Sequence, residues 1–401
     1  MAPVAELSSA IAHTTASGAA PKKPNWFSTG SLETHDDGSH ILHWSDWSAG
    51  SSSSSSSAAT SESRREVFLA SLRRCMTSTG FFYLDGSPLE SLREELFRVT
   101  AAVFASPESE RSQILMVDSP HFRGYSPLYE EQTQGKADQR DQIDYGPQVE
   151  GRPKAEFAPH RLLGPNQFLP DHVLPGHQSV ILQYTRRAQE LSDQLTTALE
   201  LALGAPQNAL HQFMKSEQDD SYFRMKTIRY PNARGGGDQG VGAHKDGGWL
   251  TLLATMPAKG LQVQLASGDW VDVPHRTGAI IVNAGQQIER VTRGLLVAAT
   301  HRVFADPTVG ERLSAPFFSM PALSKVVRPL PLDSLSPQFR AAFEAAKAAR
   351  GGDDVKSDVP RGDLWGGEEE PFGELAWRGI TRSHSQVVDR WHRDVVPPTA
   401  S

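Results

Sequence analysis

The chain has 401 residues, of which 38% are hydrophobic and 22% charged, a balance typical of a globular protein with a large core. The formal net charge is -7 and there is no block of basic residues, which argues against nucleic acid as the main partner. The single cysteine, Cys75, excludes an internal disulfide and a cysteine-based zinc site, and no apolar run approaches the roughly 18 residues needed to span a membrane.

The N-terminal segment, residues 1–38, is rich in Ala, Ser and Thr and is expected to form a disordered lead. It has neither a basic start nor a long apolar stretch, which favours a mobile tail, although a transit peptide remains an open alternative. The single cysteine is consistent with a reducing compartment, so we expect a cytoplasmic protein.

Residues 39–221 predict a helical N-terminal region that starts with a short strand over residues 40–47. A serine-rich insertion at about 48–62 is expected to be a flexible surface loop, because serine supplies no apolar surface to bury. Helical periodicity of the apolar residues covers 64–76, 87–105 and 176–203. Ser87 is the predicted N-cap of the second of these helices. A buried strand is expected over 80–86.

After Tyr222 the pattern changes to short apolar runs separated by Gly, Pro and Asn. The expected strands cover residues 222–231, 249–255, 260–265, 269–274, 278–285, 296–304 and 312–320. Strands at this close spacing predict a β-sandwich or jelly roll. We therefore expect an α+β fold in which one all-β core, residues 222–322, is wrapped by helices. A C-terminal helical extension, residues 323–401, is expected to pack on this core.

A histidine and an aspartate two positions apart on a strand point to the same face and can bind one metal ion together. The chain contains three such pairs, His35/Asp37, His244/Asp246 and His392/Asp394. The first lies in a polar stretch without strand character, and no histidine follows the third. Only the second pair adjoins a predicted strand and is followed by another candidate ligand, His301. Two histidines and one carboxylate form the facial triad of non-haem iron(II) oxygenases. The alternative is a solvated strand edge.

A second pair of polar residues shares one face of the last predicted strand. Arg312 and Ser314 stand two positions apart in "RLSAPFF". The planar guanidinium suits a carboxylate, and an arginine among apolar residues needs an anion nearby. The anion is either a ligand or a structural Asp or Glu of the chain, and both interpretations remain open at this point.

From Tyr222 to Ala322 the chain resembles the isopenicillin N synthase-like branch of the iron(II)/2-oxoglutarate dioxygenases. The family's blocks occur in order: "IRYP", "GAHKDGGWLTLL", "GLQV", "GDWVDVP", "GAIIVNAG", "ATHRV" and "RLSAPFF". Looser similarity extends over residues 40–395. The resemblance implies a double-stranded β-helix with Fe(II) held by His244, Asp246 and His301.

The same resemblance implies a binding site for 2-oxoglutarate. Arg312 and Ser314 are expected to hold its distal carboxylate, and Tyr230 matches a tyrosine that helps to seat it. The chain departs from the family at Ile228, where many members have Asn, and at Gln286, where an acidic residue often stands. Neither position is an expected metal ligand.

The activity implied is the coupling of 2-oxoglutarate decarboxylation, with dioxygen, to hydroxylation, desaturation or cyclisation of a small organic molecule in specialised metabolism. Two alternatives remain open. One is an iron-dependent oxidase of the same fold that does not use 2-oxoglutarate, and the other is a non-catalytic ligand-binding protein. The sequence makes no prediction about the oligomeric state.

Lys226 shares strand parity with Tyr230 and is therefore expected to face the core interior. A buried lysine needs an anion, which predicts contact with a substrate that carries a carboxylate or an acidic phenol or enol. The alternative is a lysine at the strand end that reaches solvent. Arg123 and Lys245 are weaker candidates, expected to be surface or structural residues.

Overall fold

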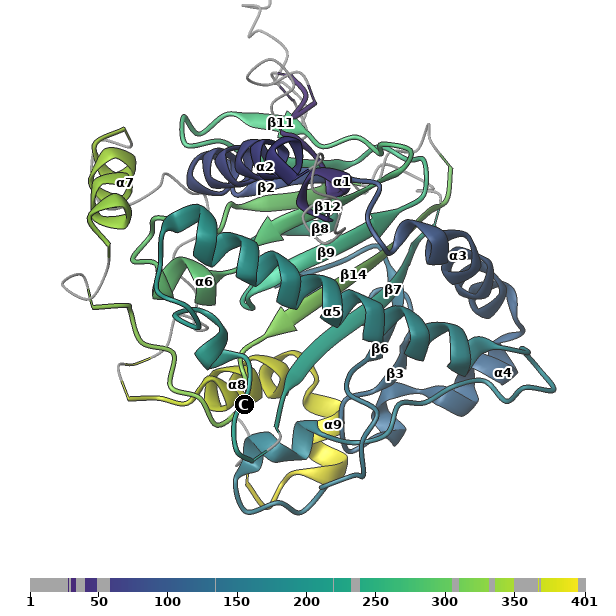
Figure 1. Ribbon diagram of the computed structural model, residues 1–401. Helices are drawn as coiled ribbons and strands as arrows, with labels where there is room; N and C mark the ends of the chain where they lie inside the picture. Colours follow the sequence, from purple (N-terminus) through teal and green to yellow (C-terminus); the bar gives the residue numbers. More distant parts are fainter. Residues whose placement is uncertain are drawn as a thin grey trace, which may run out of the picture.

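The computed structural model describes residues 28, 30–33, 40–48, 58–133, 135–218, 220–231, 239–304, 310–331, 336–349, 367 and 369–395. Within them two β-sheets face each other and helices cover the outer face of the larger sheet (Figure 1). This arrangement confirms the predicted α+β fold with a jelly-roll core.

The large sheet has eight strands among the described residues, in the order β1-β2-β12-β9-β14-β7-β6-β3. These strands are β1 (Ile41–His43), β2 (Phe81–Asp85), β12 (Ala279–Ala284), β9 (Leu250–Thr255), β14 (Arg312–Met320), β7 (Tyr222–Tyr230), β6 (Asp141–Tyr145) and β3 (Gly124–Ser126). The β1–β2 pair is parallel and the other pairs are antiparallel. Strands that are distant in sequence therefore meet at the centre of the sheet.

The small sheet has the order β11-β10-β13-β8. Its strands are β11 (Trp270–Asp272), β10 (Leu261–Gln264), β13 (His301–Phe304) and β8 (Gln239–His244), and a separate hairpin consists of β4 (Gln132–Thr133) and β5 (Lys136–Ala137). Apolar residues of both sheets, such as Ile228, Val263 and Ile281, form one buried cluster between them. The site described below opens into this interior.

The outer face of the large sheet is covered by α2 (Ala58–Ser78), α3 (Glu90–Ala105) and the long helix α5 (His177–Leu203) (Figure 1). Helix α5 ends at Leu203, as predicted, because the next residue, Gly204, adopts a left-handed conformation with φ 62°. The other α-helices are α1 (Trp44–Ser48), α4 (Glu108–Arg111), α6 (Gln286–Val291), α7 (Pro337–Ala349), α8 (Phe372–Ser383) and α9 (Ser385–Trp391). Among the described residues, no helix is both long and apolar enough to cross a membrane.

Two helix boundaries differ from the prediction. Helix α2 begins at Ala58, so the serine-rich insertion does not extend to residue 62, and residues 49–57 lie outside the described part. Helix α3 begins at Glu90 with Leu89 as its N-cap. Ser87 is not the cap: its carbonyl accepts the Glu90 N–H at 3.0 Å, in a turn before the helix. No side chain caps this helix. It begins after a backbone turn that contains Pro88, whose ring fixes φ near the helical value.

The predicted disordered lead is wrong for residues 30–33. Leu32 is fully buried, and its N–H donates to the carbonyl of Asp272 in β11 over 2.8 Å. The apolar side chain fills the end of the cluster between the sheets, which offsets the entropy lost on ordering. The preceding residues, apart from Ser28, lie outside the described part of the chain.

Helices α8 and α9 of the C-terminal extension contact the N-terminal helical region, where the ring of Phe122 lies against those of Trp377 and His392. The N–H groups of Phe372 and Gly373 donate to the carbonyls of Lys325 and Leu323. Arg161 forms a bidentate ion pair with Asp394, in which both N–O distances are 2.9 Å. Residues 351–366 lie outside the described part.

Candidate active site

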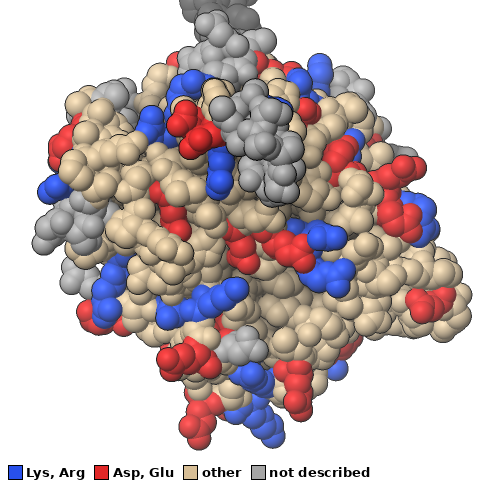
Figure 2. All heavy atoms as spheres, viewed as in Figure 1, with Lys and Arg blue, Asp and Glu red and all other residues tan. Residues whose placement is uncertain are grey.

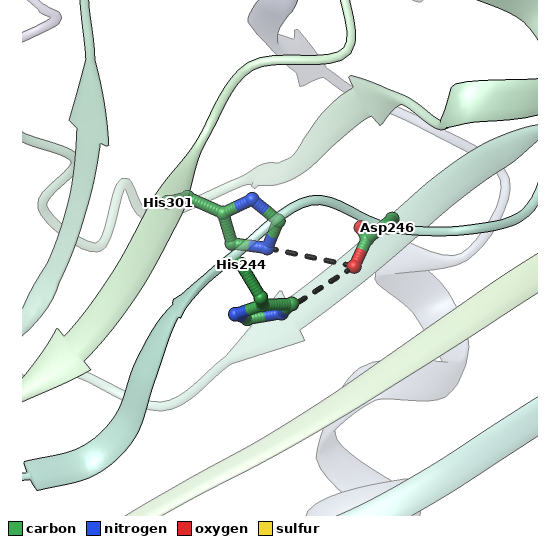
Figure 3. A group of neighbouring side chains, drawn as sticks. All are labelled: His244, Asp246 and His301. Carbon is green, nitrogen blue, oxygen red and sulfur yellow. Dashed lines mark ion pairs between the residues drawn. The ribbon is translucent and has the colours of Figure 1, made fainter. Parts of the chain in front are cut away.

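His244, Asp246 and His301 converge on one point (Figure 3). His244 ends β8 and His301 begins β13, and the two are register partners in the small sheet. The Nε2 atoms of His244 and His301 lie 3.6 and 3.5 Å from the same oxygen, Oδ1 of Asp246. One ligand atom from each residue lies within 4.8 Å of the others, a spacing that one metal ion can bridge.

The hydrogen bonds of the two imidazole rings fix which nitrogen faces the site. Nδ1 of His244 lies 2.9 Å from the carbonyl of Gly242, and Nδ1 of His301 lies 3.2 Å from that of Ala299. Because a carbonyl only accepts, each Nδ1 carries the proton and each Nε2 presents its lone pair to the site. Burial, aided by His244, lowers the pKa of His301 to about 4, which keeps this ring neutral near pH 7.

The carboxylate of Asp246 is buried and ionised. Burial by itself raises the pKa of Asp246, but His301, His244 and the hydrogen bond from Thr251 outweigh this effect and hold it well below its usual range. Oδ2 accepts hydrogen bonds from Thr251 at 2.6 Å and from Asn283 at 2.8 Å, which leaves Oδ1 turned to the histidines. Two imidazole nitrogens and one carboxylate oxygen are the donor set of a non-haem Fe(II) site.

Lys245 and Glu289 connect the two segments that carry these ligands. Lys245 lies between His244 and Asp246, and its Nζ is 3.8 Å from Oε2 of Glu289 in α6, both side chains being buried. Oε1 of Glu289 accepts the N–H of Ala298, close to His301, at 3.2 Å. Lys245 is therefore a structural residue, one of the two roles predicted for it.

A cavity of about 70 Å³ continues from the triad into the space between the sheets. Its wall includes Tyr230, Arg312 and Ser314, the three residues expected to bind the cosubstrate. Nη1 of Arg312 donates to Oγ of Ser314 at 3.3 Å, and its guanidinium carbon lies 4.8 Å from the centre of the Tyr230 ring. Among the described residues, no Asp or Glu lies within ion-pair distance of Arg312, and burial lowers its pKa. The structural ion pair considered for Arg312 is therefore not formed by the described residues.

Lys226 is buried and faces inward, but it is not a free cation. Its Nζ lies 3.3 Å from Oδ1 of Asp144 and 3.8 Å from Oε2 of Glu131, and it is not part of the cavity wall. The prediction of an anionic substrate rested on an unpaired lysine, and that premise is wrong. Arg123 is fully buried and donates to the carbonyls of His121 and Leu162, a structural role.

The other two His-x-Asp pairs do not form a similar site in the described part of the chain. His35 and Asp37 lie outside it. His392 is fully buried and donates through Nε2 to the carbonyl of Pro120 at 2.7 Å, whereas Asp394 turns to Arg161. These two residues hold the C-terminal extension in place.

Sequence reasoning missed Thr251, Asn283 and Arg140. Thr251 and Asn283 are register partners on β9 and β12, so a polar residue within each apolar run was the only available signal. Arg140 lines the cavity directly before β6, a strand that the sequence did not predict. Acidic and basic side chains are mixed over the face seen in Figure 2, without a broad patch of one sign.

Residues 220–321 match the 2OG-Fe(II) oxygenase superfamily, and residues 53–171 match the family model "non-haem dioxygenase in morphine synthesis N-terminal". The 2-oxoglutarate-dependent dioxygenase frbJ of Dothideomycetidae sp. (strain 11243) is 30% identical over 339 residues, which cover 82% of this chain and 89% of that relative. A 2-oxoglutarate-dependent dioxygenase of Gibberella zeae is 34% identical over 275 residues, or 64% of this chain and 71% of the relative.

A full-length Neurospora crassa protein, solved in complex with alpha-KG and 5-formyluracil, has the same fold. The TM-score is 0.63 at 18% identity, over 85% of this chain and 95% of that one. The catalytic family model covers almost entirely the stretch from Tyr222 to Ala322 that carried the resemblance, and the N-terminal model lies within the region of looser similarity. The chain therefore belongs to the 2OG-Fe(II) oxygenase superfamily, a family of oxidoreductases that use Fe(II), 2-oxoglutarate and dioxygen.

Proposed function

We propose that His244, Asp246 and His301 bind the Fe(II), and that Arg312, Ser314 and Tyr230 bind the distal carboxylate of 2-oxoglutarate. The observation that carries this assignment is the buried guanidinium of Arg312, which has no acidic partner among the described residues and shares one cavity with the triad. A buried cation without an anion is costly, and the carboxylate of a bound ligand would offset that cost. This favours use of 2-oxoglutarate over the alternative of an oxidase that dispenses with it.

When bound, the iron supplies the oxidising chemistry, and the protein residues supply position and exclusion of water. Gly242 and Ala299 hold the two imidazole rings through their carbonyls. Thr251 and Asn283 fix the carboxylate of Asp246. Apolar side chains such as Ile228, Leu253 and Phe318 line part of the cavity wall, and they lower the local polarity in which Arg312 would meet an anion.

The primary substrate is a small organic molecule, and we propose that it belongs to specialised metabolism. It approaches the triad from the side of His244, whose side chain is 33% exposed, whereas the other two ligands are buried. We also propose a cytoplasmic location, which rests on the single cysteine and which imaging of the tagged chain would test.

The experiment is an anaerobic measurement of iron stoichiometry, followed by an assay of succinate formation on admission of air. The wild-type chain should bind one Fe(II) and form succinate from 2-oxoglutarate, whereas His244→Ala and Asp246→Ala should do neither. His43→Ala is the matched control, because His43 and Asp85 form an exposed pair at 3.0 Å elsewhere on the sheet. Unchanged iron stoichiometry in both site variants would refute the assignment.

A further inference from the structure

Arg140 is a second arginine in the wall of the cavity that contains the triad and Arg312. It directly precedes β6 and is only 9% exposed. Its Nε is buried and has no hydrogen-bond partner among the described residues. A buried donor without a partner is costly unless a ligand satisfies it, so this atom needs an acceptor.

The sheet register places Arg140 beside Tyr230. Tyr230 pairs with Arg312 across β7 and β14. Asp141 pairs with the residue that precedes Tyr230, so Arg140 lies opposite Tyr230 on the other side. Arg140, Tyr230 and Arg312 therefore form one row across three adjacent strands, and all three side chains line the same cavity.

The acidic neighbours of Arg140 engage one end of its guanidinium. Nη2 lies 3.1 Å from Oδ2 of Asp138 and 3.7 Å from Oε2 of Glu131. Burial opposes charge on Arg140, but Tyr230, Glu131 and Asp138 offset it and its pKa lies above the usual value. Arg140 thus remains a cation that its own carboxylates hold in place, which preorganises it for a ligand.

We propose that Arg140 is a second guanidinium that binds 2-oxoglutarate, acting together with Arg312 across Tyr230 at the distal carboxylate. This inference rests on the proposed function of the cavity. A carboxylate has about four lone-pair sites and can accept donors from two arginines at once. The primary substrate is the less favoured occupant, because Arg140 lies in the enclosed row of Arg312 while the exposed edge of the site is at His244.

The test uses two probes on the Fe(II)-loaded full chain without oxygen. One is 2-oxoglutarate, and the other is 2-oxopentanoate, which has the same chain length but a methyl group in place of the distal carboxylate. Arg140→Met removes the donors, and Arg140→Lys keeps a positive charge beside Asp138 and Glu131 without the Nε edge. Arg229→Met is the control, because Arg229 pairs with Asp141 and does not line the cavity.

Arg140→Met should raise the dissociation constant of 2-oxoglutarate at least tenfold and leave that of 2-oxopentanoate and of Fe(II) within twofold. Arg140→Lys should raise the dissociation constant of 2-oxoglutarate several-fold. The control, Arg229→Met, should leave all three dissociation constants unchanged. An equal weakening of both probes, or no weakening of 2-oxoglutarate in the folded Lys variant, overturns the proposal. The proposal is also overturned if Arg140→Met changes only the turnover of a primary substrate and not the binding of 2-oxoglutarate.

Failure of the proposed function gives a different result. In that case the wild-type protein does not distinguish the two probes, and Arg312→Met has no effect on either. If Arg312→Met abolishes the preference for 2-oxoglutarate while Arg140→Met retains it, the function stands and the role of Arg140 is refuted.

Discussion

Thr251 donates a hydrogen bond to Asp246 over 2.6 Å, so the only carboxylate of the triad is oriented from a neighbouring strand. Asn283, the register partner of Thr251, donates to the same oxygen at 2.8 Å. Strands β9 and β12 of the large sheet therefore orient Asp246, which lies in the turn after strand β8 of the small sheet. The metal geometry consequently depends on how the two sheets face each other.

Replacement of Thr251 by valine, which has nearly the same shape, should weaken Fe(II) binding by about 10–100-fold, because the hydrogen bond that orients Asp246 is lost. Anaerobic titration with Fe(II) measures the effect. Thr255→Val is the matched control, since Thr255 lies on the same strand and face but contacts His275. Equal iron affinity in the two variants would show that Asn283 alone suffices.

The loss of Arg312 should affect the cosubstrate and not the metal. Arg312→Ala should cost about 2–5 kcal/mol of 2-oxoglutarate binding, because the distal carboxylate loses a buried charged partner. The loss should appear as a higher KM for 2-oxoglutarate, with iron affinity little changed. Arg312→Lys should also be impaired, because a point charge cannot replace the fork of donors. A KM within twofold of the wild-type value in Arg312→Ala would rule out this role.

The triad could be predicted from the sequence because its signals are local. His244 and Asp246 stand two positions apart at the mouth of a strand, and His301 follows in another apolar run. Arg312 and Ser314 were found by the same parity argument, and the structure places both in the cavity wall with the triad. Arg312 and Ser314 share one face of β14, as side chains at i and i+2 of a strand do, whereas Asp246 lies in the turn after β8 and meets His244 from there.

The partners of Lys226 could not be predicted, because they depend on strand pairing. Asp144 lies opposite Lys226 on β6, and Glu131 stands close to the β4–β5 hairpin. Neither short element carries strong apolar periodicity, so the sequence did not reveal a carboxylate beside the lysine. The sequence correctly predicted that the side chain of Lys226 points inward. Which acidic residues lie beside it depends on the order of the strands in the sheet.

Lys226→Met should therefore act mainly on stability. Removal of the ammonium leaves Asp144 and Glu131 buried with fewer cations, and we expect a loss of about 3 kcal/mol in the free energy of unfolding. The KM for 2-oxoglutarate should stay near the wild-type value. Chemical denaturation and steady-state kinetics on the same preparation separate the two effects. A variant with unchanged stability and weaker binding of a primary substrate would restore the substrate role.

His177 should make the stability of the fold depend on pH. It is buried, its Nδ1 accepts the N–H of Leu169 at 3.2 Å, and its Nε2 donates to the hydroxyl of Tyr145 at 2.9 Å. Burial lowers the pKa of His177 from 6.5 to about 4. A second ring proton would also oppose the Leu169 N–H, so the folded state keeps this ring neutral.

Between pH 6.5 and pH 4 the unfolded chain therefore binds a proton at His177 that the folded chain does not. This contribution to stability is complete above pH 6.5 and is lost as the pH falls towards 4, to a total of about 3 kcal/mol. His177→Gln removes the titrating group, so the stability gap between wild type and variant should narrow by about 2 kcal/mol from pH 7 to pH 5. Urea unfolding at the two pH values measures this gap. A constant gap would show that His177 has the same pKa in both states, and a gap that widens at pH 5 would show a higher pKa in the folded state; either result contradicts the prediction.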